Sequence, residues 1–155
     1  MRHDEARPPS PDTAARQEQA PGAVRTAGQA RAVVAQLLGG DVHPDGRVLA
    51  DVQLVVTELV ANALRHGGGL TAFAARLEPG GARLVVDVED GDDRHPVAQP
   101  FHGRDPASGG GRGWAIVQAL TSTCQVQPLP VGGKRIRVTF VLPPASAGFG
   151  PESAG

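Results

Sequence analysis

The stretch TELVANALRHGGG, Thr57 to Gly69, decides the fold, because it sets three polar side chains inside an otherwise apolar helical run. Glu58, Asn62 and His66 follow one another at intervals of four residues, so on a helix of about 3.6 residues per turn they stack along one face. The apolar positions beside this row are Val55, Leu59, Val60, Ala63 and Leu64. The spacing predicts a largely buried helix that carries a polar row.

A polar row in a buried setting needs partners, since an unpaired neutral polar group costs roughly 2 to 7 kcal/mol and a charge costs more. Glu58 lies one turn from Asn62, and a carboxylate beside an amide oxygen in a recess suits Mg2+ together with an activated water or hydroxyl. Two alternatives stay open. The row could simply reach the surface, or the backbone could satisfy its side chains.

Length and charge limit the class of protein. The chain has 155 residues, enough for one domain with a real core, and its net charge is -1. The charges are scattered, so neither a nucleic-acid footprint nor a membrane-surface patch is expected. The longest apolar runs fall short of a membrane span and the N-terminus is charged and Pro-rich, which predicts a cytoplasmic protein. The single cysteine, Cys124, is expected to be a small buried residue.

The pattern along the chain predicts one α+β domain over residues 22–143, between disordered tails at 1–21 and 144–155. Helices and strands come in blocks with hairpins, which predicts a two-layer sandwich whose mixed, mostly antiparallel sheet is covered by helices on one face. The expected elements are helices over 24–38 and 44–66, strands over 71–77 and 83–89, a helix over 114–120, and strands over 124–127 and 135–142.

Between Asp90 and Arg112 the chain shows no sustained period and is rich in Gly, Pro, Asp and Ser. A segment of this length without structure of its own is unusual in a compact domain unless it is a functional lid. It ends in GGGRGWAIV, where a glycine cluster leads into a helix and could cradle phosphate, or could be a plain linker. Asp90 ends a strand, where it could accept from an exocyclic amine or cap the turn.

Common nucleotide-binding motifs are absent from the sequence. The P-loop pattern fails because the chain's one lysine, Lys134, is followed by Arg135 where Ser or Thr should stand. The dinucleotide fingerprint fails because Ile116 stands where its third glycine belongs.

The chain contains three elements in order: an ExxxNAxxH helix, a strand ending in Asp, and a Gly-rich loop entering a helix. They resemble the N, G1 and G2 boxes of the GHKL (histidine kinase-like) ATP-binding superfamily. The sequence ELVANALRHG is most similar to the first box of the bacterial anti-sigma-factor serine/threonine kinase branch. The resemblance covers residues 24–142 and implies a Bergerat-type α/β sandwich, with ATP held between the helix layer and a mobile lid.

The resemblance implies a role for five residues of the three boxes. Asn62 becomes the Mg2+ ligand, Glu58 the base that orients or deprotonates the attacking hydroxyl, and Asp90 the group that recognises the adenine amine. Gly111 and Gly113 become the backbone N-H donors to the phosphates.

Other positions match the boxes less fully. His66 closes the first box without an assigned role, and Arg104 and Arg112 are both candidates for a lid arginine that contacts phosphate. The G1 box usually reads DxGxG, but here Asp92 and Arg94 stand where glycines are expected.

The resemblance implies an ATP-dependent protein serine/threonine kinase that phosphorylates a partner, an anti-sigma-factor antagonist, and so controls transcription through a sigma factor. The altered G1 box favours an alternative, a non-catalytic ATP-binding partner-switching module that sequesters a regulator; Glu58 favours catalysis. A histidine kinase catalytic domain is disfavoured, because no helical segment with a phosphoacceptor histidine is evident. Neither nucleic acid nor a membrane is expected as a partner, and a homodimer is compatible with these expectations.

Overall fold

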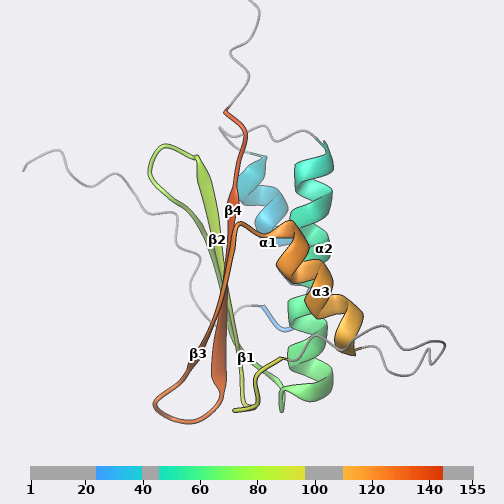
Figure 1. Cartoon of the computed structure of the whole chain (residues 1–155). Coiled ribbons are helices and arrows are strands. Elements are labelled where there is room, and N and C mark those ends of the chain that lie inside the picture. The colour runs from blue at the N-terminus through green and yellow to red at the C-terminus, as the bar shows by residue number, and fades with distance from the viewer. Residues whose placement is uncertain (1–23, 40–45, 97–109, 145–155) are drawn as a thin grey trace, which may run out of the picture.

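The computed structural model describes residues 24–39, 46–96 and 110–144, and there three helices lie against one face of a four-stranded sheet (Figure 1). The helices are α1 (Ala27–Leu38), α2 (Gly46–His66) and α3 (Gly110–Leu120). The strands are β1 (Leu70–Leu77), β2 (Arg83–Asp90), β3 (Thr123–Pro128) and β4 (Lys134–Val141). This confirms the predicted α+β fold.

The sheet has the strand order β1-β2-β4-β3, and all three pairings are antiparallel rather than mixed. The predicted hairpin joins β1 to β2, and its Gly80 and Gly81 have φ angles of 87° and 69°, which glycine adopts without steric cost. β2 and β4 are not consecutive in the chain, yet their register places Asp90 directly opposite Lys134.

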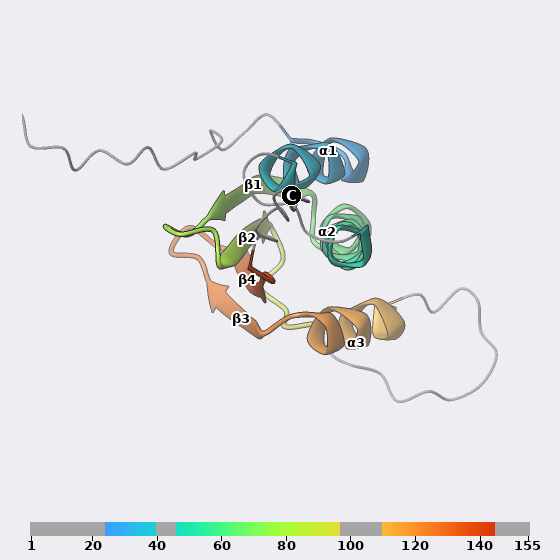
Figure 2. The same ribbon diagram turned by 90° about the horizontal axis from the view of Figure 1, so that it is seen from above.

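The core lies between the sheet and the helices. Viewed from above, α1 lies beside β1, α3 beside β3, and α2 between the two other helices (Figure 2). Alternate residues of β4 point into this core, as its period of two predicts. The side chains with less than 2% of their surface exposed are Leu38, Leu59, Leu84, Val34, Val52, Val55, Val56, Val60, Val86, Val88, Val117 and Val138.

Three local expectations need correction. The sequence pattern places Leu64 among the apolar residues beside the polar row, but 49% of its surface is exposed. Cys124 is half-buried, and this burial raises the pKa of its thiol. The third helix begins at Gly110 rather than at Trp114, because packing against α2 overrides the weak helix propensity of glycine.

Several predicted segments lie outside the described residues: the N-terminal tail, residues 145–155 of the C-terminal tail, residues 44–45 of the second expected helix, and residues 97–109 of the expected lid with Arg104. Among the helices that the structure describes, none combines the length and apolar character needed to cross a bilayer.

Candidate functional site

The polar row of α2 runs from the interior to the surface. Glu58 and Asn62 are half-buried, whereas His66, in the last turn, is exposed. Of the two alternatives for this row, simple surfacing therefore applies to His66.

Asn62 carries an unusual acceptor. In the described part of the chain, its Oδ1 is the one buried side-chain nitrogen or oxygen without a hydrogen-bond partner. A buried acceptor left unsatisfied costs about 1 to 3 kcal/mol. Satisfaction by the backbone is therefore wrong for this oxygen, whose capacity to accept a hydrogen bond or a metal is unused among the described residues.

The chemistry of this oxygen fits Mg2+, which prefers oxygen ligands. No cluster of three or more His, Cys, Asp or Glu side chains that could hold a metal occurs within residues 24–39, 46–96 and 110–144. A magnesium ion at Asn62 would therefore take most of its ligands from phosphate oxygens and water, as Mg2+ commonly does in nucleotide sites.

Glu58 lies against the first turn of α3. A Cβ atom built on Gly113 would overlap Oε2 of Glu58 and lie 3.1 Å from its Cδ. Gly113 is buried, so the absence of a side chain there lets α3 approach the Glu58 carboxylate. This contact is a reason for glycine that the sequence alone did not reveal.

The first turn of α3 contains the glycines predicted to bind phosphate. The first four N-H groups of a helix lack intrahelical acceptors and its N-terminus attracts negative charge. Because α3 starts at Gly110, the N-H of Gly111 is one of these groups, whereas Gly113, the fourth residue of the helix, lies one place beyond them. Arg112 belongs to the same turn and is exposed.

Asp90 ends β2 on the face of the sheet that carries the helices. Its side chain is 6% exposed, and its Oδ1 accepts hydrogen bonds from Nζ of Lys134 at 2.9 Å and from the N-H of Asp92 at 3.0 Å. The second bond means that Asp90 does cap its turn, one of the two predicted roles. The ion pair with Lys134 was not predicted from the sequence.

The other carboxylate oxygen of Asp90 lies near the end of α2. A Cβ on Gly67 would lie 2.7 Å from Oδ2 of Asp90, so this glycine also permits close packing. At about 1.5 Å per residue, roughly 13 Å of chain separates Gly67 from Glu58 along α2. The structure thus aligns Asp90, Asn62 and the start of α3 along one helix, although the residues lie far apart in the sequence.

The segment after Asp90 is held by its own charges and by β4. Arg94 bonds to both carboxylate oxygens of Asp92 at 3.0 Å through Nε. This bond lowers the pKa of Asp92 to about 2 and raises that of Arg94. Asp93 accepts the N-H of Gly133 at 2.6 Å. These contacts occupy the positions where the resemblance expected a glycine-rich turn.

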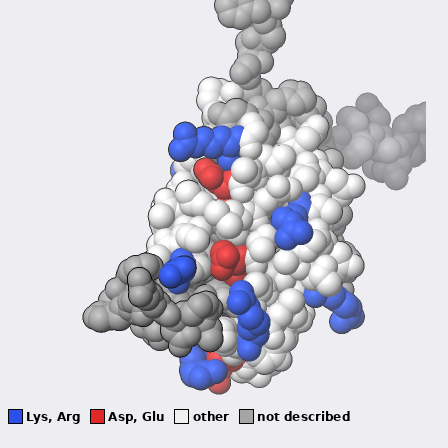
Figure 3. Space-filling model, turned by 90° about the vertical axis from the view of Figure 1, so that its right-hand side faces the viewer, with Lys and Arg blue, Asp and Glu red and all other residues white. Residues whose placement is uncertain are grey.

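The helix-bearing face shows scattered charges among the described residues, with no large patch of either sign (Figure 3).

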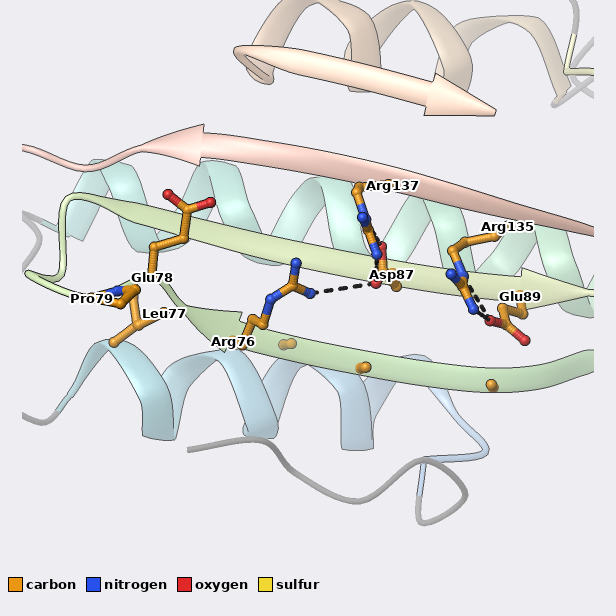
Figure 4. Close-up of a pocket in the computed structure, with 11 residues that line it drawn as sticks. Arg76, Leu77, Glu78, Pro79, Asp87, Glu89, Arg135 and Arg137 are labelled. Carbon is orange, nitrogen blue, oxygen red and sulfur yellow. Dashed lines mark hydrogen bonds and ion pairs between the residues drawn. The ribbon is translucent and has the colours of Figure 1, made fainter. Parts of the chain in front are cut away.

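A separate hollow of about 700 Å³ lies on the opposite face of the sheet (Figure 4). Its arginines are paired: Arg137 donates to both oxygens of Asp87 at 2.7 Å, Arg76 approaches Asp87 at 3.5 Å, and Arg135 donates to Glu89 at 2.8 Å. Since these charges neutralise one another and the α2 row faces the other way, this hollow is not the predicted nucleotide site.

Comparison with known families agrees with the geometry. The family model described as the histidine kinase-like ATPase domain matches residues 20–140, a span that contains the three helices, β1, β2 and β3 in full and all of β4 except Val141. A comparison with curated proteins gives no significant match. The matched region holds the α2 row, Asp90 and the first turn of α3, and the chain belongs to the histidine kinase-like ATPase domain family.

Proposed function

We propose that this ATP-binding domain is a protein kinase that transfers the γ-phosphoryl group of ATP to a serine or threonine of a partner protein. One observation supports this most strongly: the partnerless Oδ1 of Asn62 lies one turn from the carboxylate of Glu58, which in turn lies against the first turn of α3. A metal ligand, a base and a phosphate-binding turn are the parts that phosphoryl transfer requires.

Each group has a distinct task in the proposed reaction. Asn62 would hold Mg2+ through Oδ1, and the bound ion neutralises phosphate charge. The N-H of Gly111 would hold a phosphate oxygen at the positive end of α3, beside Gly113, whose lack of a side chain lets the helix approach Glu58. The carboxylate of Glu58 would accept the proton of the attacking hydroxyl. At the same time the hydroxyl oxygen bonds to the γ-phosphorus, and the bond between the γ-phosphorus and the ADP oxygen breaks.

The proposed partner is an anti-sigma-factor antagonist protein, through which the kinase would control a sigma factor in the cytoplasm. The support for this branch is the wording ELVANALRHG, which runs from Glu58 through Gly67. The scattered charge of the helix-bearing face is in keeping with a protein partner rather than with nucleic acid.

A second candidate is a non-catalytic module that uses ATP to hold a shape competent for partner binding. The segment after Asp90 favours it, because Asp92 and Arg94 replace the expected glycines and pair with each other. This ion pair fixes a turn that glycines would leave adjustable.

Phosphotransfer from radiolabelled ATP to purified antagonist proteins tests the proposal. We expect wild type to label a partner, and Glu58→Gln to bind ATP normally while labelling falls by roughly 10²-fold or more, the usual contribution of a positioned base. Glu78→Gln is the matched control, since Glu78 lies beside the β1-β2 hairpin and pairs only loosely with Arg83, at 3.9 Å. Equal labelling by Glu58→Gln contradicts the catalytic role, and ATP binding without labelling of any partner favours the non-catalytic module.

A further inference from the structure

The buried ion pair between Lys134 and Asp90 calls for an explanation. The two side chains are 8% and 6% exposed, and Nζ of Lys134 donates to Oδ1 of Asp90 and to the carbonyl oxygen of Asp92, both at 2.9 Å. Removing two charges from water is costly, and well-packed apolar residues are often at least as stabilising as such a pair. A role in ligand specificity explains the ion pair better than a contribution to stability alone.

The contacts leave the two oxygens of Asp90 in different states. Oδ1 accepts from Lys134 and from the N-H of Asp92, so two donors fix it in place. Oδ2 has neither of these donors and faces the end of α2 at Gly67. The carboxylate is therefore held in one orientation, with one oxygen kept for another donor.

The start of β4 supports this arrangement. Gly133 has a φ of 83°, and a Cβ there would overlap the carbonyl oxygen of Asp90, so β4 comes very close to the end of β2. The same glycine donates its N-H to Asp93. Gly133 and Lys134 together hold the turn after Asp90, in place of the glycines missing from that turn.

We propose that Lys134 is the positioning residue for base recognition: by fixing Oδ1 of Asp90, it presents Oδ2 as an acceptor and so selects a purine with an amine at position 6. A purine with a carbonyl at that position would bring an acceptor against an acceptor, which leaves both unsatisfied. The inference depends on ATP binding by this family and is independent of the proposed phosphotransfer.

The test compares the binding of ATP and ITP by calorimetry, because ITP has a carbonyl where ATP has the amine. A hydrogen bond to a charged group should make wild type prefer ATP by roughly 10- to 100-fold. Lys134→Met should reduce this preference to about threefold or less, because the carboxylate is free to turn. Arg135→Met is the matched control: it removes an ion pair between the same two strands, that of Arg135 with Glu89, on the other face of the sheet, and should keep the preference.

A second variant tests orientation directly and retains Lys134. In Asp90→Asn, Lys134 and the N-H of Asp92 remain donors, so they should hold the amide oxygen and turn the amide NH2 toward the base. We expect this variant to prefer ITP over ATP, a reversal that a purely structural role of Lys134 would not produce.

The outcomes separate clearly, with circular dichroism used to verify folding. A preference of Asp90→Asn for ITP over ATP supports the inference. This result is sufficient if Lys134→Met fails to fold. Three results would each overturn the inference. A folded Lys134→Met could keep the wild-type preference for ATP over ITP, Asp90→Asn could still prefer ATP, or wild type could bind ATP and ITP equally well. Since only binding is measured, a failed phosphotransfer experiment leaves this result unaffected.

Discussion

Replacing Gly113 with alanine should reduce phosphotransfer while leaving the fold intact. The new Cβ would overlap Oε2 of Glu58, whereas Cγ of Glu58 would lie at an ordinary contact distance of 3.6 Å. The carboxylate must therefore swing away by roughly 1 Å while the rest of the side chain stays in place. A displacement of this size at a catalytic group can cost about 10²-fold in rate.

The effect on stability follows from two opposing terms. Alanine gains up to about 1 kcal/mol over glycine within a helix. Moving Glu58 away from its rotamer costs about 0.5 to 1.5 kcal/mol. The free energy of unfolding of Gly113→Ala should therefore stay within about 1 kcal/mol of the wild-type value.

The assay measures phosphotransfer at saturating ATP, so that a change in affinity does not enter the rate, together with urea unfolding. The matched control is Gly28→Ala in α1, where a Cβ would meet its nearest neighbours at 3.8 Å and would have no atom of Glu58 within 4 Å. We expect that control to keep full activity. Wild-type activity in Gly113→Ala would refute the role given to the position of Glu58, as would an equal loss in Gly28→Ala.

Two further predictions concern charges outside the α2 row. Asp87→Ala should lower the free energy of unfolding by about 2 kcal/mol without changing ATP affinity, because Arg76 and Arg137 lose their shared carboxylate on the other face of the sheet; urea unfolding and calorimetry measure the two effects. Arg94→Ala should return the pKa of Asp92 from about 2 toward 3.8, as followed by NMR titration. Folding depresses this pKa, so in wild type the contribution of Asp92 to stability is present above about pH 4 and is lost as the pH falls through about 2. The Arg94→Ala variant should lose this pH dependence.

Elements with strong local signals were predicted well from the sequence. α2 has a clear helical period, and EPGGA between two strand-like runs marks the β1-β2 hairpin. The start of α3 was missed because Gly110 and Gly111 have weak helix propensity, and packing on α2 is a tertiary effect.

The site was predicted only where its residues are local in the chain. Glu58 and Asn62 are one turn apart, so their proximity follows from helical geometry. The Asp90-Lys134 pair joins residues 44 positions apart through the register of two non-consecutive strands, for which the sequence has no local signal. The same holds for the contact of Gly113 with Glu58, which depends on how two helices pack.

The central claim, that Asn62 holds the magnesium of a bound Mg-ATP, is tested most directly by titrating ATP into wild type and Asn62→Ala by calorimetry, with and without Mg2+. Because Oδ1 of Asn62 has no hydrogen-bond partner in the described structure, its removal breaks no hydrogen bond of that oxygen, so the variant should remain folded. We expect Mg2+ to strengthen ATP binding by wild type and to have little effect on the variant. Absence of ATP binding by wild type at millimolar concentration, or an equal Mg2+ effect in both proteins, would contradict the claim.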